Sequence, residues 1–138
     1  MKDILENDVD EKYYIPEEKL EKWKYQKGAK KIERVSKSGH RYTFSEGSCP
    51  FPDKLDQPAR TMLTSEGTLN RSSHVILDPQ TNRYRILTPV EAERCQGFLD
   101  NWTDNMPNRM RYFCMGNALV VSMISRIGTA LDQIIEKT

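Results

Sequence analysis

One stretch in the second half of the chain constrains its fold more than any other part. Tyr84 to Leu87 is aromatic, β-branched and apolar, which predicts a short strand. Thr88 follows as a helix N-cap, with Pro89 at the first helical position and Glu91 where a capping box needs an acid. Gly97 is then suited to end the helix. The sequence therefore predicts a strand that leads directly into a short capped helix.

Further elements are expected on both sides of this unit, and together they predict an α+β fold. Before it we expect a short helix at Pro16–Trp23, a hairpin at Lys30–Phe44, and short strands at Arg60–Thr64 and His74–Leu77. After it we expect a short helix at Asn108–Met115, broken by Gly116 and Asn117, and a long helix at Leu119–Lys137. The apolar residues of the last helix recur on one side, so that side must be buried against something.

Charge is balanced over the whole chain but segregated along it. The 21 basic and 20 acidic residues give a net charge of +1. Residues 1–22 carry eight acidic side chains against four basic ones, whereas residues 23–41 carry seven basic side chains against one acidic one. A local basic block is what a polyanion-binding surface needs, although a charge run is more often only a solvated surface.

Several classes of function lack their usual signals. The three cysteines, Cys49, Cys95 and Cys114, form no CxxC pair, which predicts a reducing, cytoplasmic location with no disulfide and no metal site. No apolar run approaches the roughly 20 residues of a membrane span, so we expect no membrane partner. Neither His40 nor His74 has a Ser or Cys partner at a known catalytic spacing. No catalytic residue is predicted.

The polar loops between the predicted strands are better suited to a phosphate backbone. Their candidate DNA-contacting residues combine cations, amides and short hydroxyls, which commonly contact phosphates and base edges. These residues are Arg60, Thr61, Thr64, Ser65, Asn70, Arg71, Ser72, Ser73 and His74. The residue types alone also fit an ordinary surface of polar hairpin loops, so both readings stay open at this point.

Two longer motifs connect the chain to a known family. Residues 85–102 and residues 116–121 resemble, in order and separation, the ninth and tenth motifs of the DNA (cytosine-5)-methyltransferases. Residues 60–65 resemble the threonine-containing end of that family's target recognition domain, and residues 2–14 resemble the connector after its eighth motif. Leu99 and Ser122 depart from the family pattern, since each stands where a proline is usual or common.

The resemblance implies a division of the chain into three parts. Residues 1–23 would form an acidic connector, and residues 24–115 a small, mainly β target recognition domain that includes the ninth motif. Residues 116–138 would form the tenth motif and a C-terminal helix, which packs on a catalytic domain not present in this chain. Within the domain, residues 24–77 would face the major groove of the DNA.

The resemblance also implies roles for individual residues. In the ninth motif Glu91 would cap the helix, Arg94 would be a half-buried charge bonded to nearby backbone, Gln96 would be a packing amide, and Gly97 would end the helix. In the tenth motif Gly116 and Asn117 would lie against the cofactor, S-adenosylmethionine. The cofactor would be bound mainly by the missing catalytic part.

The family's catalytic segments are not found in this sequence. Cys49 precedes Pro50, whereas the family's nucleophilic cysteine follows a proline, so Cys49 is not assigned that role. In the family, a cysteine thiolate adds to cytosine C6, a glutamate assists at N3, and C5 takes the methyl group. The target base is first flipped out of the duplex, at a cost of a few kcal/mol.

The favoured interpretation is therefore the small, DNA-recognising subunit of a split methyltransferase. Alone it is expected to be inactive, and it would need a larger catalytic subunit that carries the nucleophilic cysteine in order to methylate double-stranded DNA. A bacterial or phage restriction–modification system and a nucleoid-associated, cytoplasmic location would follow. Two alternatives fit the same residues: a non-enzymatic DNA-binding fragment or regulator, and an excised part of one longer polypeptide.

Overall fold

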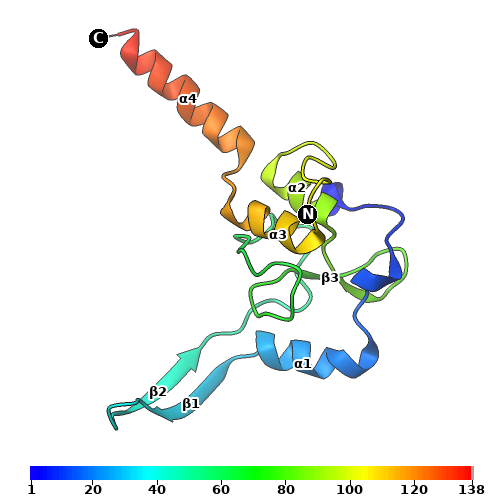
Figure 1. Ribbon diagram of the computed structural model, residues 1–138, viewed down its shortest axis with the longest axis vertical. Helices are drawn as coiled ribbons and strands as arrows, with labels where there is room; N and C mark the ends of the chain where they lie inside the picture. The colour runs from blue at the N-terminus through cyan, green and yellow to red at the C-terminus, as the bar shows by residue number, and fades with distance from the viewer. Residues whose placement is uncertain (138) are drawn as a thin grey trace.

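The computed structural model describes residues 1–137, which form a loop-rich body with an arm at each end (Figure 1). One arm is the hairpin of β1 (Lys30–Val35) and β2 (Arg41–Glu46), which follows α1 (Glu17–Lys27). The other arm is α4 (Val121–Ile135), which leaves the body on the opposite side. The body contains η1 (Lys2–Ile4), η2 (Glu11–Tyr13), β3 (Val75–Leu77), β4 (Tyr84–Ile86), α2 (Pro89–Gln96) and α3 (Asn108–Asn117). The last residue of the expected 116–138 part lies outside the described residues.

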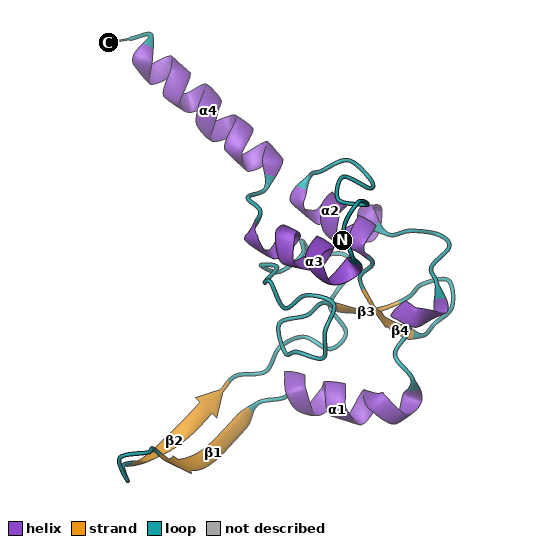
Figure 2. Ribbon diagram, viewed as in Figure 1, coloured by secondary structure: helices purple, strands orange, loops and turns teal. Residues whose placement is uncertain are grey.

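The α+β class is confirmed, but the expected mainly β character is wrong. Within the described range the strands form two separate antiparallel pairs, β1–β2 and β3–β4, and loops make up most of the body (Figure 2). The predicted strand at Arg60–Thr64 is not formed. The side chain of Arg60 is held by Asp53, and the backbone at Leu63 and Thr64 packs against Gly116. These contacts, rather than a strand partner, fix this segment.

The strand-to-helix unit is as predicted. β4 pairs with β3, with Ile86 opposite Val75, and α2 begins directly after the Thr88 cap. The Thr88 hydroxyl accepts the Glu91 backbone N–H at 3.1 Å, and Glu91 Oε2 accepts the Thr88 backbone N–H at 2.8 Å. Gly97 ends the helix in the left-handed conformation, with φ of +81°. The full capping box gives the helix a fixed start on the sheet edge.

The flanking helices differ from expectation at their ends. α1 runs on to Lys27, and α3 continues through Gly116 to Asn117 rather than breaking at the glycine. A Cβ atom on Gly116 would lie 2.3 Å from the backbone nitrogen of Thr64. Gly116 therefore allows α3 to touch the 63–64 backbone, and the helix ends at Asn117, where the following Ala118 takes an extended conformation.

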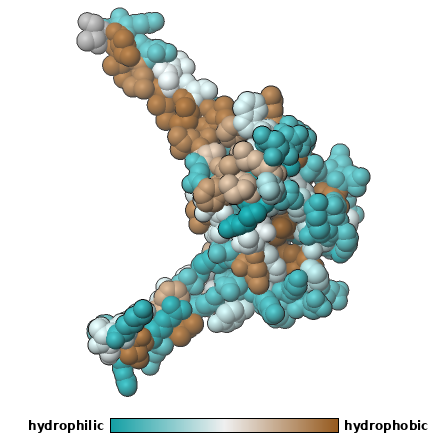
Figure 3. Space-filling model, viewed as in Figure 1, coloured by the Kyte–Doolittle hydropathy of each residue, from teal (hydrophilic) through white to brown (hydrophobic). Residues whose placement is uncertain are grey.

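The apolar core is small and lies in the body and against α1. One cluster joins Met62, Ile76, Leu87, Ala92, Tyr112 and Met115, and a second joins Ile15, Trp23 and Val75. In contrast, none of the residues of α4 is buried. Its apolar residues form a continuous stripe along the helix (Figure 3), and they include Val121, Met123, Ile124, Ile127 and Leu131.

Candidate functional site

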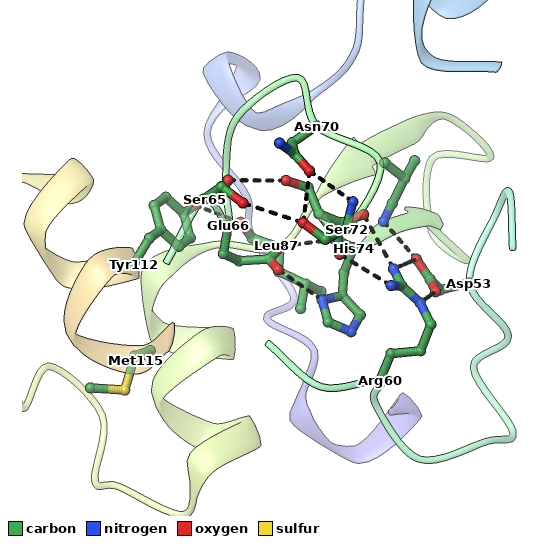
Figure 4. A network of polar contacts seen from close by, with 12 residues as sticks. Asp53, Arg60, Ser65, Glu66, Asn70, Ser72, His74, Leu87, Tyr112 and Met115 are labelled. Carbon is green, nitrogen blue, oxygen red and sulfur yellow. Dashed lines mark hydrogen bonds and ion pairs between the residues drawn. The ribbon is translucent and has the colours of Figure 1, made fainter. Parts of the chain in front are cut away.

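Arg60 connects two polar loops inside the body (Figure 4). Its guanidinium binds Asp53 through two bonds, Nε to Oδ1 at 2.5 Å and Nη2 to Oδ2 at 3.1 Å. The same group donates to the backbone carbonyls of Ser72 at 3.1 Å and Ser73 at 3.3 Å. The half-buried Arg60, predicted as a DNA contact, therefore has most of its donors bound within the chain.

Lys27 completes this cluster from the end of α1. It is only 1 % exposed, and its ammonium donates to the Ser73 carbonyl and lies 3.6 Å from Asp53. Burial lowers the pKa of Lys27, and the nearby Asp53 carboxylate opposes that effect. Burial also raises the pKa of Asp53, but the Arg60 and Val75 donors and the Lys27 charge outweigh it, so the pKa lies below its usual value. This role could not be predicted from the residue pattern, because Lys27 stands within a longer basic run.

The loop of residues 65–74 is braced mostly by its own polar groups. His74 donates its backbone N–H to Glu66 at 2.8 Å, and its Nδ1 lies 3.0 Å from the second oxygen of that carboxylate. The Ser73 hydroxyl donates to the Thr68 carbonyl at 2.7 Å. Asn70 Oδ1 accepts both the backbone N–H and the hydroxyl of Ser72. These bonds fix the loop without regular secondary structure.

The predicted DNA-contacting residues are therefore placed unequally. The side chains of Ser73 and His74 are fully buried, so they shape the loop and do not face a ligand. Thr61 is exposed, and the half-buried members of the set are Arg60, Thr64, Ser65, Asn70, Arg71 and Ser72. A loop must also satisfy its own polar backbone groups, and some of these nine residues serve that need.

Arg71 reaches away from this loop to the base of the β1–β2 hairpin. Its Nη1 lies 2.7 Å from Glu46 Oε2, and its Nη2 donates to the Gly47 carbonyl at 2.6 Å and to Cys49 Sγ at 3.3 Å. The guanidinium thus joins the 65–74 loop to the end of β2.

An open groove brings part of both predicted sites together. It has a volume of about 360 Å³ and lies between the 59–62 segment, the end of α2 and the 116–123 segment. Arg60, Thr61 and Gly116 contribute to its walls, whereas Asn117 is exposed beside it and donates its amide to the Phe113 carbonyl at 3.2 Å. Its lining residues are Ala59, Arg60, Thr61, Met62, Cys95, Gln96, Gly116, Ala118, Leu119, Val120 and Met123.

The groove contains few groups that could hold the expected cofactor. Among its lining residues the one charged group is Arg60, which is already paired with Asp53. Apolar walls and the neighbouring Asn117 amide suit one side of S-adenosylmethionine, but its charged amino-acid end needs further partners. Cys95 also lies in the groove, where burial raises the pKa of its thiol to about 12, so it stays protonated near neutral pH.

The ninth-motif residues form a brace that holds α2, whose last turn lines the groove. Glu91 accepts from the Glu6 backbone N–H at 2.9 Å and receives both terminal nitrogens of Arg85 at 2.8 Å. Arg94 donates to the Ile4 carbonyl at 2.9 Å and forms two bonds to Asp100. These contacts tie the N-terminal connector to α2.

Two further residues belong to this brace: Gln96, which was predicted from the sequence, and Arg85, which was not. Gln96 is buried, and its amide donates to the Met115 carbonyl at 2.8 Å, which joins α2 to α3. Sequence reasoning missed Arg85, a fully buried cation whose Nε also donates to Asp78 at 2.7 Å. Its signal was a charge between two apolar residues of a short strand.

Two further features bear on the expected ligands. Within residues 1–137 there is no group of three His, Cys, Asp or Glu side chains placed to hold a metal ion. By length and composition alone, Asn108–Ile135 would be long and apolar enough to cross a membrane, which the sequence reading had not anticipated. However, α3 and α4 are separate helices, and α4 keeps Ser125, Thr129 and Asp132 along the side opposite its apolar stripe.

Comparison with known proteins gives three relatives, all named as type II methyltransferases. The chain is 52% identical to M.Sau3AI of Staphylococcus aureus over 96% of its own length, 29% identical to M.DsaV of Dactylococcopsis salina over 99%, and 27% identical to M1.ScrFI of Lactococcus lactis subsp. cremoris over 98%. It spans only 32%, 35% and 32% of these proteins, respectively. No solved structure matches the chain. The model of the C-5 cytosine-specific DNA methylases matches residues 1–133, nearly the whole chain, which therefore belongs to that family.

Proposed function

We propose that the chain is the DNA-recognition part of a DNA cytosine-5 methyltransferase of the restriction–modification type. The complete enzyme would transfer a methyl group from S-adenosylmethionine to C5 of a cytosine within a specific duplex sequence. A larger catalytic part, on a second chain or on the same longer polypeptide, would supply the nucleophilic cysteine. The observation that carries the proposal is the open groove, whose apolar wall continues into the uncovered stripe of α4.

The cysteines of this chain fit a supporting role rather than attack on a base. Cys95 is held in its protonated form by burial. Cys49 is half-buried beside Arg71 at the base of the hairpin, and Cys114 lies on α3 with its sulfur 3.8 Å from that of Met106. Since covalent addition to cytosine needs a thiolate held next to the flipped base, the nucleophile is assigned to the catalytic part.

The groove would form one side of the cofactor site in the complete enzyme. Bound there, S-adenosylmethionine supplies the methyl group. Gly116 lets α3 approach the 63–64 backbone, and Asn117 offers an exposed amide beside the groove. The catalytic part would provide the remaining partners of the cofactor, because the described walls contain no unpaired charged group.

The face formed by the 59–65 segment and the 65–74 loop would lie against DNA. Thr61, Thr64, Ser65, Asn70 and Ser72 present hydroxyls and an amide that are exposed or half-buried there. Ser73 and His74 would act by setting the shape of the loop, since their side chains are buried. Backbone N–H groups of such loops would contact phosphates and fix the position of the DNA, while exposed side chains would reach base edges.

The apolar stripe of α4 would be covered by the catalytic part. Leu131 is 53 % exposed and Ile127 is 49 % exposed, so the stripe gains little from the body of this chain. A helix with an apolar side and a polar side is expected to bury the apolar side. Fully burying one such side chain stabilises by about 1.5–3 kcal/mol, so several together can hold two protein parts in one complex.

The test is reconstitution of methyl transfer. The chain alone should incorporate no labelled methyl groups into DNA, and adding the catalytic part should restore incorporation. Leu131→Asp should abolish both complex formation and methylation, whereas Ser125→Asp on the polar side of α4 should leave both intact. If the chain bound DNA but restored no activity with its catalytic part, it would be a non-enzymatic DNA-binding fragment instead.

A further inference from the structure

The β1–β2 hairpin is an arm with no cover of its own. Its strands pair with each other from Lys30 opposite Glu46 to Val35 opposite Arg41, and the arm projects from the body (Figure 1). Ile32 is 37 % exposed, and Val35 and Tyr42 are 62 % and 43 % exposed. An isolated two-stranded hairpin is only marginally stable in water, so an arm of this kind is expected to gain order from a partner.

Cations lie on both faces and at the tip of the hairpin. Side chains alternate along each strand, so the observed register puts Lys30 and Arg34 on one face, and Lys31 and Arg41 on the other. Lys37 lies in the turn between the strands. Only two acidic residues, Glu33 and Glu46, lie within residues 30–46, and Glu46 is paired with Arg71 from the body.

The arm's cations are also largely available. Within the described part of the chain, the side chains of Lys31, Lys37 and Arg41 make no hydrogen bond or ion pair. Arg34 stacks over the ring of Phe44 at 3.9 Å, which holds its guanidinium in place and leaves its N–H donors free. By contrast, Arg60 and Arg71 of the loops are already bound to carboxylates and carbonyls.

The base of the arm is fixed in direction. Arg71 binds Glu46 at 2.7 Å and the Gly47 carbonyl at 2.6 Å, so the end of β2 is attached to the 65–74 loop. Two residues further on, the Cys49 backbone N–H donates to the Lys27 carbonyl at 2.7 Å, which attaches the same segment to the end of α1. The arm therefore leaves the body in a set orientation relative to the candidate DNA face.

We propose that the β1–β2 hairpin enters the major groove of duplex DNA and that Arg71 positions it. The major groove is wide enough for a two-stranded β-ribbon, and phosphates line both walls, which matches cations on both faces of the arm. Lys31, Lys37 and Arg41 contact phosphates, while Arg34 and its opposite neighbour Tyr42 face base edges. This inference rests on the proposed function and gives its DNA surface a second, more basic element than the 59–74 loops.

The first test compares double variants in the assembled enzyme, the chain together with its catalytic part. Binding to labelled fragments of plasmid DNA is measured by fluorescence anisotropy over a range of salt. Lys37→Ala/Arg41→Ala should weaken binding about 10-fold or more and lower the slope of log K against log salt by about 2, because each lost phosphate contact removes roughly 0.9. The matched control, Lys19→Ala/Lys22→Ala on the exposed side of α1, should leave both values unchanged.

The second test separates positioning by Arg71 from direct contact. Glu46→Ala removes an acidic group from a DNA-facing arm, so by charge alone it would tighten DNA binding. If Arg71 positions the hairpin through Glu46, then Glu46→Ala should weaken binding as Arg71→Ala does. Tighter or unchanged binding by Glu46→Ala would overturn the positioning role.

The outcomes distinguish this inference from the proposed function. If the unaltered enzyme binds and methylates plasmid DNA but the hairpin variants match it, the hairpin lies outside the DNA contact and the proposed function stands. An unaltered enzyme that binds no DNA would end both proposals. Loss of DNA binding by the hairpin variants, with normal assembly with the catalytic part, supports the arm as a DNA-contacting element.

Discussion

Replacing Arg85 by methionine should destabilise the body far more than replacing its neighbour Arg83. Arg85 is fully buried, and it donates to Asp78 at 2.7 Å and twice to Glu91 at 2.8 Å. Arg85→Met keeps most of the side-chain volume but leaves two buried carboxylates without their countercharge. Breaking one partner of a buried ion pair costs about 3–5 kcal/mol, which is a large part of the roughly 5–15 kcal/mol that holds a domain folded.

The remaining contacts of the two carboxylates make this cost mainly electrostatic. Asp78 keeps the Tyr14 hydroxyl at 3.1 Å and the backbone N–H groups of Gln80 and Thr81. Glu91 keeps the backbone N–H groups of Glu6 and Thr88. Hydrogen bonds therefore still reach both groups, and the loss reflects uncompensated charge.

Urea unfolding followed by circular dichroism measures the effect. Arg83→Met is the matched control, because Arg83 is exposed and its pair with Glu11 lies at the surface, where ion pairs contribute little. Its midpoint should stay near that of the unaltered chain. Equal midpoints for the two variants, or a loss below about 1 kcal/mol for Arg85→Met, would refute the assignment of Arg85 as the centre of the brace.

Acidic solution provides an internal check on the same variant. Burial by itself raises the pKa of Asp78, but bonds from Arg85 and from backbone N–H groups bring it below its usual value. Without Arg85, the pKa of Asp78 should rise. Protonated Asp78 carries no charge to compensate, so the difference between variant and unaltered chain should shrink as the pH falls below about 5.

Three more predictions concern the groove and its supports. Gly116→Ala should lower the free energy of unfolding in urea by about 1–3 kcal/mol, because its Cβ would lie 2.3 Å from the Thr64 nitrogen, whereas Gly128→Ala in open space on α4 should not lower it. Asp53 has a lowered pKa in the folded chain, so its stabilising contribution is present above about pH 4 and is lost as the pH falls through that lower value; Asp53→Asn should flatten this acid dependence of the unfolding free energy. Cys95, with a pKa of about 12, should be alkylated by iodoacetamide at pH 8 much more slowly in the folded chain than in urea, and equal rates would contradict its burial.

The features that could be predicted from the sequence are those with local causes. The capping box of α2, the left-handed Gly97 and the turn of the β1–β2 hairpin around Gly39 each depend on residues within a few positions of one another. In these places the residues that determine the backbone conformation are neighbours in the sequence, so their types are enough to predict it. Local rules therefore identified the unit that positions the groove.

The features that could not be predicted depend on partners distant in the chain. Gly116 is a residue type that usually breaks a helix. Here its lack of a side chain allows α3 to contact the backbone of residues 63–64, about fifty positions earlier. Arg85 lies between two apolar strand residues, a pattern that usually places the charged side chain toward solvent. In the structure its guanidinium instead faces inward and pairs with Asp78 and Glu91. No pattern of residue types shows which way a charged side chain faces before its counterions are located.

The same limitation decides where DNA-binding cations should be sought on this protein. Loops without regular structure leave backbone carbonyls that need donors, and Arg and Ser meet that need as readily as they bind phosphate. Arg60 and Arg71 donate to the carbonyls of residues 72, 73 and 47, so their charge is already used in shaping the loops. The hairpin differs, because the inward-facing backbone groups of its two strands pair with each other and the outward-facing ones lie at exposed edges open to water, so they require no side-chain donors. Within the described residues Lys30 bonds Gln26 and Arg34 stacks on Phe44, but Lys31, Lys37 and Arg41 make no hydrogen bond or ion pair, and an external polyanion is the partner that their placement fits.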